Sequence, residues 1–333
     1  CSFVDPSVNS SVPPLDADFF TQLQRIKNEK HKSLVGDVIK DVVDIFGNNF
    51  SVGMEQVFTT LEHSIKMVST TKQTSRYNQQ DLRQKRDRLV QAIAATLEES
   101  IASASTIPQA CKHHDKLVRD IMRPGDDILS FNYDCIIDDS LKRHGDNKWN
   151  PRYGYCFNLG PRGKRFEGDE HWVPSTPASR EQTIHCMKLH GSLHFDITNR
   201  DDQSSYRVKL KVRPYTKQNG KLHFDIIPPE WNKTFDSGAF SDLWKKAAKV
   251  IHRAQHIVLI GYSLPPTDIH STALFRTSVK KGCLKSLVVV NPDRSARARS
   301  RDIFQTAMNQ NTRVLSFDYL DHFVAADREI WAV

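Results

Sequence analysis

The sequence predicts an α/β fold in which a Rossmann-like parallel sheet has helices on both faces and carries an N-terminal helical insertion. Two patterns lead to this prediction. In the final third, nearly continuous apolar runs alternate with helical patterns, as in the buried strands of a parallel sheet. In the first third, apolar residues recur at helical spacing in one segment after another. We therefore expect residues 1–333 to form a single domain, with the helical insertion at about 34–125.

The first third of the chain predicts a series of amphipathic helices. Apolar residues at helical spacing indicate helices over 16–30, around 42–45, over 53–68 and over 81–101. The polar and basic stretch between the last two predicts a solvated loop that merges into an exposed helix face. These segments carry core-packing side chains and no recognisable chemistry.

The rest of the chain changes to the short apolar runs of β-strands. Strands are predicted at 127–131, 184–189, 256–263, 284–292 and 313–317, and helices at 267–280 and 295–308. Two further runs, 206–212 and 221–227, could pair as an antiparallel unit. Residues 144–182 are rich in Gly, Pro, Arg and aromatic residues, and this composition predicts a long irregular excursion that is either disordered or close to a site.

Composition excludes several classes of protein. With 38% hydrophobic and 26% charged residues the chain is an ordinary globular protein, and no apolar run approaches the roughly 20 residues of a membrane span. The 6 cysteines lie far apart, without the spacing of zinc sites, which favours reduced thiols in the cytoplasm. A net charge of +8 is compatible with a polyanionic partner, although it does not by itself indicate nucleic acid.

Four short motifs begin where predicted strands end. They are Ser130–Asp134, Lys188–Ser192, Gly261–Pro266 and Val290–Asp293. Each marks a change from an apolar run to polar or turn-forming residues. Because ligands of open parallel sheets bind at the carboxyl ends of the strands, we expect these side chains to converge on a binding site.

The order of these motifs resembles the sirtuin family. That family has Asn-Ile-Asp after one strand, His-Gly after a later one, then a Gly-Thr-Ser-Leu run, and an Asn after the next strand. This chain has Asn132-Tyr133-Asp134, His190-Gly191, Gly261-Tyr262-Ser263-Leu264 and Asn291 in the same order. The resemblance covers residues 126–295 and, more loosely, the beginning of the chain. The family's Gly-Ala-Gly turn would lie just upstream of Cys1-Ser2, so we expect the chain to lack its true beginning.

The resemblance implies that the chain binds NAD and cleaves the bond between nicotinamide and ribose. Asn132 would hold water or a ribose hydroxyl, and His190 would act as a general base toward a ribose hydroxyl or the water. Asp134 would hydrogen-bond the nicotinamide carboxamide. The other residues implied to contact NAD are Ser2, Gly261, Ser263 and Asn291.

Each motif also has a purely structural explanation. Asn132 and Asp134 could cap a helix that begins near Cys135. Gly261 and Ser263 could form a plain turn, and the Asn291 motif could start a helix. Sequence alone leaves these alternatives open.

Two departures separate the chain from sirtuin deacylases. Between Met187 and Gly282 there is no cysteine, whereas deacylases carry a zinc ribbon of two Cys-x-x-Cys pairs there, so we expect no zinc. The long separation of Asn132 from His190 is the second departure, and we expect the 144–182 excursion that fills it to lie over or beside the NAD pocket.

With these departures the chain is more similar to the sirtuin-like NAD hydrolase domains of bacterial anti-phage systems. Such domains are encoded beside a HerA-like ATPase and often form homo-oligomers. We expect a cytoplasmic NAD hydrolase that acts as an NAD-depleting effector, with no membrane partner. The alternatives are an NAD-dependent protein deacylase and a nucleic-acid-binding or nuclease subunit on a sirtuin-like scaffold.

Overall fold

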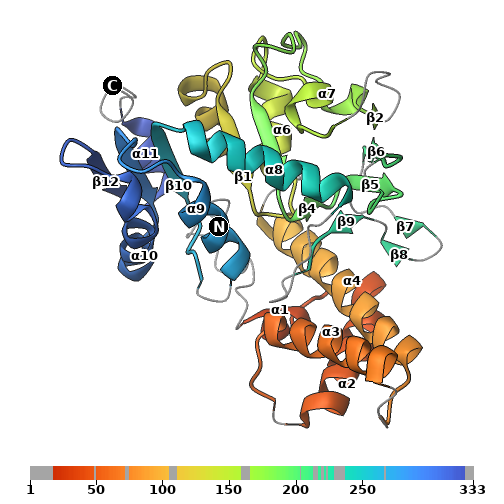
Figure 1. Ribbon diagram of the computed structural model, residues 1–333. Helices are drawn as coiled ribbons and strands as arrows, with labels where there is room; N and C mark the ends of the chain where they lie inside the picture. Colours follow the sequence, from red (N-terminus) through yellow and green to blue (C-terminus); the bar gives the residue numbers. More distant parts are fainter. Residues whose placement is uncertain are drawn as a thin grey trace. The chain divides into compact units, whose positions relative to one another are not determined.

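The computed structural model describes residues 18–326 apart from 49, 72–74, 105–110, 159–165, 203, 213–216, 219–220, 223, 229–236 and 266–267. The described residues are those of a mixed α/β protein (Figure 1). They belong to two compact units, a helical unit within Val4–Pro108 and Tyr215–Thr234 and an α/β unit within Gln109–Pro214 and Phe235–Val333. In the part of the chain that is described, no helix has the length and apolar character needed to cross a membrane.

The helical unit consists mainly of helices that pack through apolar faces. Its described elements are α1 (Phe19–Gln24), η1 (Glu29–His31), α2 (Lys32–Phe46), α3 (Met54–Thr71), α4 (Gln79–Ala104), β7 (Lys217–Gln218), β8 (Lys221–Leu222) and β9 (Asp225–Ile226). The helices expected over 53–68 and 81–101 are confirmed as α3 and α4. The helix expected over 16–30 ends at Gln24 instead, because the Asn28 side chain accepts a hydrogen bond from the Lys30 amide and starts a new turn.

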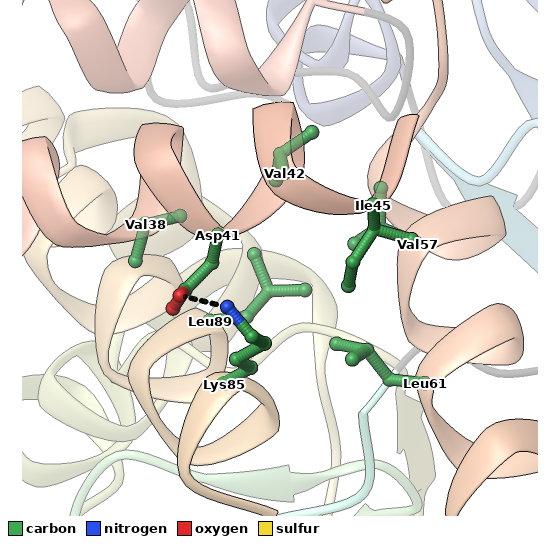
Figure 2. A pocket seen from close by; sticks show the side chains of 8 residues that line it. All are labelled: Val38, Asp41, Val42, Ile45, Val57, Leu61, Lys85 and Leu89. Atoms are coloured by element: carbon green, nitrogen blue, oxygen red, sulfur yellow. Dashed lines mark hydrogen bonds and ion pairs between the residues drawn. The ribbon is translucent and has the colours of Figure 1, made fainter. Parts of the chain in front are cut away.

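A buried ion cluster lies between α2 and α4 of the helical unit (Figure 2). The Asp41 carboxylate accepts hydrogen bonds from Lys85 at 2.6 Å and from Arg88 at 2.6 and 2.8 Å. Burial opposes the charge of Lys85, but the Asp41 and Asp44 carboxylates together outweigh this effect and raise the lysine pKa. The adjoining cavity has a volume of about 10 Å³, room for about one water, so it offers no ligand site.

The α/β unit contains three consecutive parallel strands near its C-terminal end (Figure 1, blue). They are β10 (His256–Ile260), β11 (Ser286–Val290) and β12 (Arg313–Phe317), paired in that order. Every residue of β11 is buried, as expected for the middle strand. The three strands and the helices between them confirm the predictions made for this part of the chain.

A second parallel pair is formed by β1 (Asp127–Ser130) and β3 (His185–Lys188), with Ser130 opposite Lys188. The helices of the α/β unit are α5 (Lys112–Lys116), η2 (Leu117–Ile121), α6 (Ile136–His144), α7 (Pro151–Gly154), η3 (Glu170–Trp172), α8 (Gly238–Arg253), α9 (Ile269–Ser278), α10 (Arg294–Phe304), η4 (Gln305–Ala307) and α11 (Leu320–Ala325). The sheets of the protein are mostly parallel, as the sequence predicted.

The remaining strands of this unit correct one prediction. They are β2 (Phe166–Glu167), β4 (Gly191–Ser192), β5 (Phe195–Thr198) and β6 (Arg207–Leu210). The pairing of 206–212 with 221–227 was wrong, because β6 pairs with β5 and β2, whereas β8 pairs with β7. Leu210 lies opposite Phe195 in the β5–β6 register, and both are fully buried, so this pairing brings apolar faces together.

The segment expected to be an irregular excursion, 144–182, contributes to the packed core. Its described residues include α7, β2 and η3, and Trp149 and Trp172 are fully buried. The Trp149 indole donates to the Trp172 carbonyl at 3.1 Å, and the Trp172 indole donates to the Lys211 carbonyl at 3.2 Å. Hydrogen bonds of its two tryptophans therefore join the segment to itself and to Lys211.

Candidate functional site

The first feature of the site is the convergence of three strand ends in the α/β unit. Phe131, directly after β1, stacks on Tyr262, which follows β10, with ring centroids 4.6 Å apart and an angle of 14° between planes. The Phe131 ring also meets His190, after β3, edge-on at 5.2 Å. The motifs that follow β1, β3 and β10 therefore come together, as expected for the carboxyl ends of parallel strands.

His190 lies among aromatic side chains and is only 7% exposed. The Trp244 ring of α8 is nearly parallel to the imidazole, with centroids 6.3 Å apart. The Trp244 indole donates to the Leu189 carbonyl at 3.0 Å, and Gly191 has a φ of 81°, which glycine adopts without strain. The bond from Trp244 holds the peptide on the Leu189 side of His190, and the chain turns at Gly191 directly after it.

The loop between β1 and α6 carries Asn132 and Asp134, the other two residues that were expected to act near the nicotinamide and its ribose. Asn132 is exposed, and its backbone N–H donates to the Ser130 hydroxyl at 3.3 Å. Asp134 is buried, and its carboxylate accepts from the Ile136 amide at 2.9 Å at the start of α6. The N-cap of α6 is Cys135, so Asp134 bonds the first helical amide from one position before the cap.

One titratable residue of α5 interacts electrostatically with this loop. His114, on α5, is within electrostatic range of Asp134. Burial lowers the pKa of His114 to about 4, although the Asp134 carboxylate acts in the opposite direction. The sequence offered only a His113-His114 pair without ligand spacing, so no pattern connected this side chain with Asp134.

The residues expected to contact the rest of NAD lie at the ends of β10 and β11. The Gly261 amide donates to the Val290 carbonyl at 2.9 Å, and the Ser263 carbonyl accepts from Arg299 of α10 at 3.0 Å. Asn291 is buried, and its side-chain oxygen accepts from the Asp293 amide at 2.9 Å. Gly261, Ser263 and Asn291 are thus at neighbouring strand ends, whereas Ser2 lies outside the described residues.

Beside these strand ends lies a fully buried polar network that the sequence did not predict. The Asp138 carboxylate of α6 accepts from Lys188 at 3.1 Å and from the Tyr155 hydroxyl at 2.7 Å. His194 contacts the same hydroxyl at 3.0 Å through Nε2, and its Nδ1 lies 2.8 Å from the Ser192 hydroxyl. Although burial opposes both charges, each partner stabilises the other, which raises the pKa of Lys188 and lowers that of Asp138.

The same network contains a group of three potential metal ligands, Cys135, Asp138 and His194, whose ligand atoms lie within 4.8 Å of one another. The cysteine contacts Nδ1 of His194 at 3.1 Å, whereas Asp138 lies 3.8 Å from Nε2. The two potential ligands are therefore next to different nitrogens of the imidazole, whereas a metal ion would be bound by only one of them. Burial also raises the pKa of the Cys135 thiol well above its usual value, and Lys188 already neutralises Asp138. These contacts fit a hydrogen-bond network better than a metal site.

A search of known protein families and of curated proteins found no match to this chain. The resemblance to sirtuins therefore depends on the four motifs. The structure itself shows a mixed α/β fold with mostly parallel sheets and the convergence of Phe131, His190 and Tyr262.

Proposed function

We propose that this chain is a sirtuin-like NAD glycohydrolase, which cleaves the bond between nicotinamide and ribose in NAD. The observation that carries the proposal is the contact of Phe131 with both His190 and Tyr262, which joins three of the four motifs at one set of strand ends. The ends of β10 and β11 add Gly261 and Asn291, which a dinucleotide extending along the sheet edge would reach.

The chemistry requires few groups. When the glycosidic bond breaks, its electron pair goes to the pyridine nitrogen and nicotinamide leaves as a neutral molecule. The ribose then carries oxocarbenium character, and a water molecule adds to C1′ and loses a proton. His190 would accept that proton, directly or through a ribose hydroxyl, because a neutral imidazole is an effective base near pH 7.

The two loop residues have different proposed roles. Asn132, which is exposed, would bind the attacking water or a ribose hydroxyl with its neutral amide. Asp134 would accept a hydrogen bond from the nicotinamide carboxamide in addition to its bond from the Ile136 amide, since a carboxylate has lone pairs for both.

The proposal extends to the architecture and to the biological role. The β1–β3 pair and the β10–β11–β12 sheet would be parts of one Rossmann-like sheet with helices on both faces, in a single domain with a helical insertion. By its resemblance to the anti-phage domains, the protein would deplete NAD in the cytoplasm of infected bacteria as a homo-oligomer beside a HerA-like ATPase. NAD would be its substrate, and no zinc would be needed.

The test is release of nicotinamide from NAD by the purified chain. Release without any acylated peptide, lost in His190→Ala and in Asn132→Ala, is the expected result. Release that occurs only when an acylated peptide is present would indicate a deacylase. Full activity in either variant would remove that residue from the mechanism, and no release by the unaltered chain, with or without peptide, would contradict the proposed function.

A further inference from the structure

The buried lysine of the polar network connects two segments of the candidate site. Its ammonium donates to the backbone carbonyl of Asp134 and to the carboxylate of Asp138. Lys188 is the last residue of β3, two positions before His190, and Asp134 is two positions after Asn132. One side chain therefore links the strand that leads to the proposed base with the loop that carries the proposed water-binding amide.

Further hydrogen bonds join the same loop to the residues that follow His190. The Tyr133 carbonyl accepts from the Leu193 amide at 2.9 Å and from the Ser192 hydroxyl at 3.2 Å. Two consecutive carbonyls of the loop, those of Tyr133 and Asp134, are thus bonded to the segment that contains His190. The loop is fixed to this segment through its backbone.

Stability alone does not explain a charged pair in this position. Lys188 and Asp138 both have fully buried side chains, and removing two charges from water is costly. An apolar pair of similar volume is often as stable as a buried ion pair or more so. An apolar side chain, however, has no donor for the Asp134 carbonyl.

We propose that Lys188 is a positioning residue, which holds the Phe131–Cys135 loop so that Asn132 and His190 face the same ribose. The proposal depends on the NAD glycohydrolase function. Asp138 supplies the counter-charge that keeps the ammonium buried, and the Asp134 carbonyl is the point at which the ammonium acts on the loop.

The helix that carries Asp138 provides a matched control. Ser140→Ala removes another hydrogen bond of α6, from the buried Ser140 hydroxyl to the Asp115 carboxylate at 2.8 Å, and Ser140 lies outside both the Phe131–Cys135 loop and residues 144–182. This variant should lose stability and keep the rate of NAD cleavage per folded molecule. A loss of stability and a loss of positioning can therefore be separated.

The test compares the unaltered chain with Ser140→Ala and with Lys188→Met/Asp138→Asn, which removes both charges and the donor together. We expect kcat for nicotinamide release, per folded molecule, to fall about 100-fold in the double variant, since a displacement of about 1 Å can have that effect. KM for NAD should change little, because β10 and β11 are unaltered. Hydrogen exchange of the Phe131–Cys135 amides should become faster in the double variant only.

The two measurements keep the hypotheses apart. Unchanged exchange of the loop, or an unchanged kcat in a folded double variant, would overturn the positioning role of Lys188. If the unaltered chain releases no nicotinamide, the proposed function fails, and hydrogen exchange still decides whether Lys188 holds the loop. Should the double variant not fold, Lys188→Gln/Asp138→Asn, with a shorter and uncharged donor, tests the same link by the same readouts.

Discussion

Replacing His190 by alanine tests the central claim about the site. The imidazole is 7% exposed and lies against the rings of Phe131 and Trp244, so its removal affects both packing and chemistry. The packing loss is expected to lower the free energy of unfolding by about 2 kcal/mol, at the lower end of large-to-small core substitutions. This loss leaves most molecules folded if the protein has an ordinary stability of about 5 kcal/mol or more.

The chemical loss should be larger and separable. A positioned general base accelerates a reaction by roughly 100-fold to 10,000-fold, or about 3 to 5 kcal/mol of activation free energy. We therefore expect kcat per folded molecule to fall by at least about 100-fold in His190→Ala. Nicotinamide release is measured by chromatography, and the folded fraction is measured by circular dichroism at the assay temperature.

The same strand provides the control for this substitution. His185 is the first residue of β3, and its imidazole contacts Asp127 at 2.6 Å at the opposite end of the strand from His190. His185→Ala should lose stability but keep its kcat per folded molecule. A loss of activity that follows the folded fraction equally in both variants would refute the assignment of His190 as the base.

Three further predictions concern metal, pH and ligand closure. Elemental analysis should find no stoichiometric zinc, and one zinc per chain would contradict this and favour the deacylase alternative. Burial disfavours the charged form of Asp127, but hydrogen bonds from His185 and Arg253 outweigh burial and lower the Asp127 pKa. The ionised Asp127 should therefore stabilise the fold above about pH 4, and this stabilisation should be lost as the pH falls below that value. Urea unfolding at pH 5 and pH 3 should show a smaller acid-induced loss in Asp127→Asn, and an equal loss would refute that contribution. A non-hydrolysable NAD analogue should increase hydrogen-exchange protection within 152–174, and protection confined to the strand-end motifs would assign this segment to partner contacts.

The sequence was most informative where local and global patterns agree. Strands β10 and β11 follow from apolar runs long enough to be recognised, and the meeting of Phe131, His190 and Tyr262 follows from the rule that parallel strands end on one edge. The motifs therefore predicted which loops converge without any knowledge of side-chain contacts.

The polar network could not be predicted in the same way. Asp138, Lys188 and His194 are polar residues, and sequence patterns assign such residues to the surface unless a ligand spacing suggests otherwise. Their burial depends on two segments, α6 and residues 188–194, that lie far apart in the sequence. The packing of 144–182 was missed for a related reason, because its Gly and Pro content concealed the two tryptophans that anchor it.

The buried network also determines how the pH profile of kcat should be interpreted. Burial lowers the pKa of His194 to about 3 and raises those of Cys135 and Tyr155 well above their usual values, while Lys188 and Asp138 stabilise each other's charges. None of these five groups changes its protonation near neutral pH. A change in kcat between pH 6 and pH 8 therefore has its origin outside this network. The network has the same protonation state at every pH at which a histidine base would titrate.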